Sequence, residues 1–126
     1  MFDPGTASAW KQDVALELRR YRPAQPIEQP VLLFVEFFLP RPLRLQRQRD
    51  PEEAMVMTAK PDIDNLLKAV MDSLTDDGWW HDDAIVSAVV GTKSYAAKNG
   101  RTGAHVRICL MEEGEAVELR HERSEP

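Results

Sequence analysis

The chain has 126 residues, with 43% hydrophobic and 29% charged side chains and a formal net charge of −5, which suits one globular domain and excludes two separate cores. It has no apolar run near the roughly 20 residues of a membrane helix and no start typical of a secretory signal, and its single cysteine excludes an internal disulfide or a thiolate metal cage. We therefore expect a protein of the reducing cytoplasm, with no membrane partner.

The first 40 residues predict a helix followed by a buried strand. Thr6 or Ser8 can cap this helix. Its apolar residues recur at steps of three or four: Trp10, Val14, Leu18 and Tyr21. Residues 31–39 (VLLFVEFFL) then form a nearly continuous apolar run between two prolines. Such a run is typical of a strand that is covered on both faces.

Residues 41–60 predict a long loop that is rich in arginine. Its four arginines are Arg41, Arg44, Arg47 and Arg49. Long loops in compact domains are often functional. Because guanidinium groups bind phosphates in a bidentate way, this loop favours contact with DNA over a purely solvated role. Residues 55–58 can add a short strand.

The clearest predicted element is a second helix over residues 63–74. Its apolar residues form one stripe: Ile63, Leu66, Leu67, Val70, Met71 and Leu74. Asp76, Asp77 and Gly78 are typical of a helix end. Residues 84–95 and 104–111 predict two further strands.

The end of the chain is strongly acidic. Residues 112–126 carry six glutamates against two arginines, so they hold four of the five net negative charges. The acidic total therefore argues only weakly against DNA binding by the rest of the chain. We expect one domain over residues 1–111 and a loosely ordered acidic tail over residues 112–126.

Two acids flank the start of the second helix. Asp62 and Asp64 lie where extended chain turns into helix, because Pro61 suits a helix start and disfavours helical backbone at the residue before it. Ile63 belongs to the buried stripe, so the two carboxylates are expected to point outward. Lys68 lies one turn after Asp64 on the same polar face.

Acids in this arrangement suit a divalent metal ion. Two carboxylates converge at the helix start with a third, Asp83, nearby, and hard cations prefer such oxygen ligands. In phosphodiester hydrolysis these ions activate a water and stabilise the leaving oxygen, and a lysine beside them can neutralise developing charge. From the spacing alone, acids in these positions are more often helix caps and turn residues than metal ligands.

Two stretches together closely resemble the signature of RusA-type Holliday junction resolvases. They are KPDIDNLLKAVMDSL at 60–74 and GWWHDDAIVSAVVGTK at 78–93. The resemblance extends more weakly over roughly residues 8–111. It implies an α/β (α+β) domain with a mixed sheet and helices packed on it. It also implies a homodimer that nicks four-way DNA junctions with magnesium, or with manganese as an alternative.

The resemblance assigns roles to particular residues. Asp62, Asp64 and Asp83 match the metal-binding carboxylates, and Lys68 matches the catalytic lysine. Asp82 matches the neighbouring acid. Candidate DNA contacts are Lys60, Lys93 and the four loop arginines, Arg41, Arg44, Arg47 and Arg49.

The chain departs from the family pattern at two places. Ile85 stands where family members usually have glutamine. The chain also begins almost at its first helix, where the family commonly begins with a strand, so we expect that strand to be absent and junction affinity to suffer more than the metal site. Two other hypotheses stay open: an inactive module that binds junctions without cutting, and a protein-interaction domain without metal.

Overall fold

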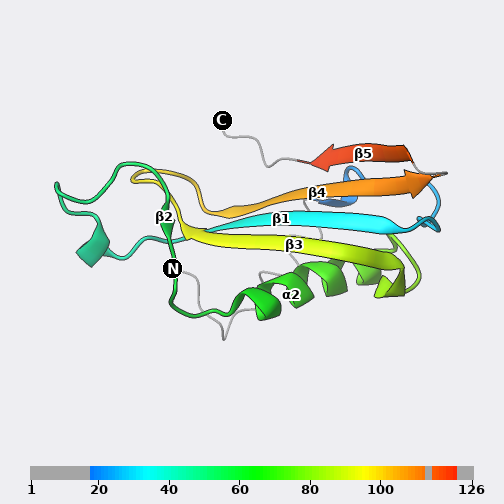
Figure 1. The fold of residues 1–126 in the computed structure, drawn as a ribbon, viewed down its shortest axis with the longest axis horizontal. Coiled ribbons are helices and arrows are strands. Elements are labelled where there is room, and N and C mark those ends of the chain that lie inside the picture. Colours follow the sequence, from blue (N-terminus) through cyan, green and yellow to red (C-terminus); the bar gives the residue numbers. More distant parts are fainter. Residues whose placement is uncertain (1–17, 113–114, 122–126) are drawn as a thin grey trace.

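The computed structural model describes residues 18–112 and 115–121 (Figure 1). Its elements are β1 (Val31–Leu39), η2 (Leu43–Leu45), β2 (Met55–Val56), α2 (Ile63–Asp76), η3 (Asp83–Ile85), β3 (Val86–Tyr95), β4 (Gly103–Glu112) and β5 (Glu115–His121), where η marks a 3-10 turn. The helix expected near the start of the chain lies outside the described residues, apart from its last turn. No helix in the described ranges is both long and apolar enough to cross a membrane.

The strands form one mixed sheet in the order β2-β3-β1-β4-β5. The neighbours β1 and β3 are parallel, and the other pairs are antiparallel. Two parallel neighbours need a crossover connection, and α2 supplies it by running back along the sheet, antiparallel to β3 (Figure 1). The expected α+β domain with a mixed sheet is therefore confirmed.

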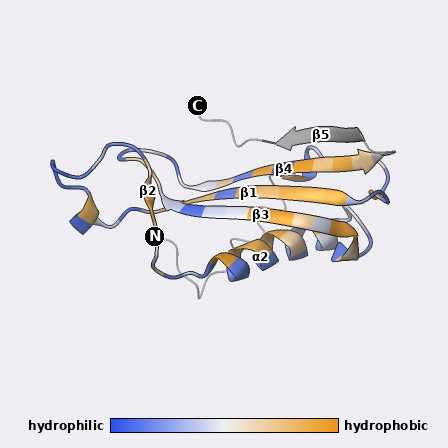
Figure 2. Ribbon diagram, viewed as in Figure 1, coloured by the Kyte–Doolittle hydropathy of each residue, from blue (hydrophilic) through white to orange (hydrophobic). Residues whose placement is uncertain are grey.

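The core lies between α2 and one face of the sheet. The side chains of β1 that point toward it are almost fully buried: Val31, Leu33, Val35, Phe37 and Leu39. The apolar stripe of α2 packs on them, with Leu66, Val70 and Leu74 buried, so the predicted stripe is confirmed. Figure 2 shows the hydrophobic residues running along the central strands and the helix.

The opposite face of β1 differs from the prediction. Its side chains alternate with the buried ones and are half-buried or, at Glu36, exposed. In the part of the chain that the structure describes, α2 covers only one face, so the expectation of cover on both faces is wrong there. The apolar run is nearly continuous because Phe34 and Phe38 lie on this second face, where polar residues would usually alternate.

Two boundaries differ from those expected. The strand predicted from residue 84 begins only at Val86, because Asp83–Ile85 form the turn η3. Residues 115–121, expected to belong to a loosely ordered tail, instead form β5 on the edge of the sheet. In the register of the two strands, Val117 pairs with Leu110 of β4. The many glutamates around Val117 make the apolar alternation of this strand hard to recognise in the sequence.

Candidate active site

The start of α2 lies at the end of the sheet where the parallel strands β1 and β3 finish (Figure 1). Lys93, near the end of β3, holds the segment that precedes α2 against the sheet. Its Nζ donates hydrogen bonds to the carbonyl oxygens of Ala59 at 2.6 Å and Pro61 at 2.9 Å. In open α/β sheets, ligands bind beyond the carboxyl ends of the strands. The first turn of α2 therefore occupies a position suited to a ligand.

Asp62 is the N-cap residue of α2, but its side chain makes no capping hydrogen bond. Its carboxylate instead accepts a hydrogen bond from Lys60 Nζ at 2.8 Å, and the two side chains are 47% and 79% exposed. That hydrogen bond lowers the pKa of Asp62, with a smaller contribution from the charge of Lys93. The carboxylate is thus ionised, accessible and not used to cap the helix.

Asp64 and Lys68 lie exposed on the first two turns of α2. The pKa of Lys60 is raised, mainly by its hydrogen bond to Asp62 and slightly by the negative charge of Asp64. Asp64 therefore belongs to the same electrostatic neighbourhood. Lys68 lies one turn beyond Asp64, at the spacing where helical side chains are neighbours.

Asp83 does not join this group within one chain. It begins η3 immediately before β3, and therefore lies at the opposite end of α2 (Figure 1). The helix has 14 residues, which makes it about 20 Å long. Over residues 18–112 and 115–121, no three acidic, histidine or cysteine side chains gather into a group that could hold a metal ion. One chain alone does not assemble the three carboxylates expected to act together.

The four loop arginines have two different environments. Arg41 is 8% exposed, and within the described residues its guanidinium donates hydrogen bonds to backbone carbonyls. The acceptors are the carbonyl oxygens of Ala96, Leu45, Pro51 and Glu53. The side chains of Arg44, Arg47 and Arg49 are exposed, and none has a hydrogen-bond or ion-pair partner in the described part of the chain. Arg41 is thus placed to hold the loop, whereas the side chains of the other three lie in solvent.

The inward direction of Arg41 was not predicted from the sequence. One signal was available, because Arg41 lies two residues after Leu39, the last buried residue of β1, and so continues its buried alternation. A side chain at that point stays close to the sheet. Composition alone groups Arg41 with its exposed neighbours.

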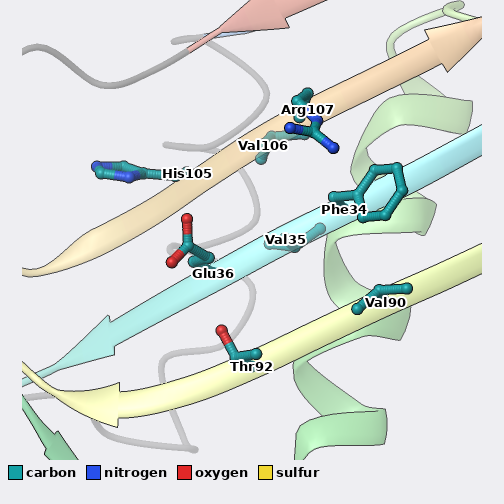
Figure 3. Close-up of a pocket in the computed structure, with 8 residues that line it drawn as sticks. All are labelled: Phe34, Val35, Glu36, Val90, Thr92, His105, Val106 and Arg107. Carbon is teal, nitrogen blue, oxygen red and sulfur yellow. The ribbon is translucent and has the colours of Figure 1, made fainter.

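A shallow pocket of about 300 Å³ lies on the sheet face away from α2 (Figure 3). It is lined by Phe34, Val35, Glu36, Val90, Thr92, His105, Val106 and Arg107. The guanidinium carbon of Arg107 lies 4.5 Å from the centroid of the Phe34 ring, a cation–π contact. None of the expected metal-binding or catalytic residues lines this pocket, so it is separate from the start of α2.

A family model described as endodeoxyribonuclease RusA matches residues 1–108. The chain belongs to the RusA family. Among curated proteins, "Uncharacterized protein YqaN" of Bacillus subtilis (strain 168) is 32% identical over 95 residues, which cover 71% of this chain and 67% of that protein. The name of this relative carries no activity, so the RusA match alone points to a function.

The match confirms the predicted family, and the family implies an endodeoxyribonuclease. RusA proteins are endodeoxyribonucleases that act on branched DNA junctions and generally depend on divalent metal ions.

Proposed function

We propose that this RusA-family chain is a magnesium-dependent endodeoxyribonuclease that resolves four-way DNA junctions by paired nicks, with manganese as an alternative ion. One observation carries the proposal. Asp62 and Asp64 are accessible carboxylates at the start of α2, and the Asp62 side chain leaves the helix uncapped and is held in its ionised form. A carboxylate whose only role was to cap the helix would accept a hydrogen bond from the first turn.

In the proposed site, Asp62 and Asp64 supply oxygen ligands at one end of the sheet. A bound divalent ion would activate a water and stabilise the leaving oxygen of the phosphodiester. Lys60 and Lys93 keep the Asp62 carboxylate charged, which is the form that binds a metal ion. Lys68, one turn along the helix, neutralises negative charge that develops on the phosphate as it reacts.

The position of Asp83 supports a homodimer as the active form. Because Asp83 lies about one helix length from Asp62 and Asp64, it can complete a three-carboxylate site only with a second copy of the chain. A two-fold axis near the middle of α2 would place Asp83 of each copy beside Asp62 and Asp64 of its partner. Such symmetry creates two identical sites, as paired nicks on two strands require.

The test is cleavage of a labelled four-way junction in magnesium, beside a matched linear duplex. The wild type should nick the junction in pairs near its crossover. Asp64→Asn should lower the cleavage rate by more than about a hundredfold, since loss even of outer-shell metal partners costs 10–100-fold. Glu36→Gln is the matched control, because it neutralises an exposed carboxylate on the sheet face away from α2 and should leave the rate unchanged.

Other outcomes would replace the proposal. Equal cleavage by the wild type and Asp64→Asn would remove the start of α2 from the chemistry. Junction binding without cutting at any magnesium or manganese concentration would favour the inactive binding module. Absence of both binding and cutting would favour the protein-interaction domain.

A further inference from the structure

The loop between β1 and β2 is unusually well anchored for a segment without regular structure. It spans residues 40–54 and contains only the short turn η2. The Arg41 guanidinium lies buried inside it and donates hydrogen bonds to the carbonyl oxygens of Leu45, Pro51 and Glu53 within the loop, and to that of Ala96 after β3. A buried charge is costly unless hydrogen bonds satisfy it. This arrangement therefore fixes the loop backbone around one side chain.

Lys98 fastens the same loop from its other side. Its Nζ donates hydrogen bonds to the carbonyl oxygens of Arg47 at 2.6 Å and Asp50 at 2.8 Å, and its backbone N–H donates to the carbonyl of Glu52 at 2.8 Å. The Lys98 side chain is only 11% exposed. Two cations thus draw the carbonyl groups of the loop inward.

The same arrangement leaves three guanidinium groups on the outside. Arg44, Arg47 and Arg49 are exposed without a partner in the described ranges. The nearby Asp50 carboxylate accepts the backbone N–H of Arg47 at 2.8 Å, and within the described ranges it makes no ion pair with any of the three guanidinium groups. The loop therefore presents three unpaired positive charges on a backbone that is already ordered.

This loop lies at the same end of the sheet as the candidate active site. The strand that follows it, β2, pairs Met55 with Tyr95 and Val56 with Ser94, beside Lys93. Figure 1 shows the loop extending beyond that end, past the start of α2. A DNA arm that reaches Asp62 and Asp64 would have its phosphates within reach of this surface.

We infer that Arg41 and Lys98 are positioning residues that hold Arg44, Arg47 and Arg49 as a preformed surface for DNA phosphates. The inference rests on the proposed nuclease function and adds how its substrate is held. Arginine suits this task because its guanidinium binds phosphate oxygens in pairs. A preformed surface binds more tightly than a flexible one, because less side-chain and loop freedom is lost on binding.

The experiment measures junction binding against salt concentration, together with KM and kcat for cleavage. Each lost phosphate contact reduces the slope of log K against log salt by about 0.9. The triple variant Arg44→Ala/Arg47→Ala/Arg49→Ala should therefore have a slope shallower by about 2.7 if each arginine meets one phosphate of duplex DNA. Its KM should rise while kcat at saturating junction stays the same, because the three arginines hold the substrate and none is assigned a part in the reaction itself.

A double-mutant cycle separates positioning from a general effect on folding. Arg41→Ala in the wild-type background should make the slope shallower and weaken binding by roughly tenfold. Without Arg41 the loop is no longer held, so Arg44, Arg47 and Arg49 must be ordered when DNA binds. In the triple-variant background it should change neither quantity further. Lys98→Met attacks the loop from its other side and should behave in the same way, which keeps the test decisive if Arg41→Ala does not fold.

Arg20→Ala is the control, because it removes an exposed arginine outside the loop and should not change the slope. If the wild type binds and cuts junctions but the triple variant keeps its full slope, the inference fails while the proposed function stands. Equal loss of binding from Arg41→Ala in both backgrounds would also overturn it. If the wild type binds no DNA, the proposed function fails together with the inference.

Discussion

At the scale of single residues, Asp62 and Asp82 show that two aspartates at turn starts can have different roles. Both occupy N-cap positions with extended backbone. The Asp82 carboxylate accepts a hydrogen bond from the N–H of Ala84 at 2.9 Å. The Asp62 carboxylate makes no capping hydrogen bond and instead accepts one from Lys60. Sequence propensity describes both residues as caps. Only the direction of each side chain distinguishes a structural acid from one that is free for a ligand.

We predict that Asp62→Ala does not lower the melting temperature of the metal-free protein. The substitution removes no capping bond, and the Lys60–Asp62 ion pair that it removes is exposed and contributes little to stability. Asp82→Ala should lower the melting temperature, since loss of a capping side chain typically costs about 1 kcal/mol. Thermal unfolding followed by circular dichroism in EDTA compares the two. An equal fall for both variants would mean that Asp62 does cap α2 in solution.

At the scale of elements, α2 packs against β3 at a point where the sheet has a glycine. A Cβ atom at Gly91 would lie 2.8 Å from both Cδ atoms of Leu67, closer than carbon atoms can approach. Gly91 is paired with Val35 in the centre of the sheet. The absence of a side chain lets the helix sit close to the strands, and this close packing positions the acids at its start.

We predict that Gly91→Val destabilises the fold by about 1–3 kcal/mol, the usual cost of overpacking a core. Adding Leu67→Ala should recover part of that loss by removing the atoms in conflict, although Leu67→Ala alone is destabilising. Urea unfolding of the wild type, both single variants and the double variant gives the interaction free energy. Simple addition of the two single effects would show that the two side chains do not compete for one space.

At the scale of the whole molecule, the two ends of α2 carry different parts of the proposed site. Asp62 and Asp64 lie at one end with Lys60 and Lys93, and Asp83 lies at the other. A single chain keeps these groups about a helix length apart. The arrangement therefore makes activity depend on how two copies meet, and this dependence can be tested without knowing the interface.

We predict that two inactive variants, Asp64→Asn and Asp83→Asn, recover cleavage when they are mixed. In a mixed dimer, one shared site would carry both substitutions and the other would carry neither, so single nicks should appear. Subunits are exchanged by refolding the mixture, and nicks are counted on a labelled junction. Each variant refolded alone is the control. Failure of the mixture to cut, when mixed dimers are shown to form, would mean that each site belongs to one chain.

Much of the fold could be predicted from the sequence because its signals are local. The apolar run of β1, the stripe of α2 and the glycine after that helix depend on residues within a few positions of one another, and all three appear in the structure. The strand β5 was missed, since a high glutamate content outweighed its short apolar alternation. The open face of β1 was missed because aromatic residues occupy positions where polar ones were expected.

The candidate site was only partly predictable. Its residue types and their order along the chain identified the family, and the match over residues 1–108 bears this out. The sequence by itself thus determined the local elements and the RusA family. The tertiary structure decided that α2 runs antiparallel to β3, which separates Asp83 from Asp62, and that Arg41 points inward to backbone carbonyls. The physical reason is that helix direction and side-chain burial depend on contacts between residues far apart in the chain, which local spacing does not contain.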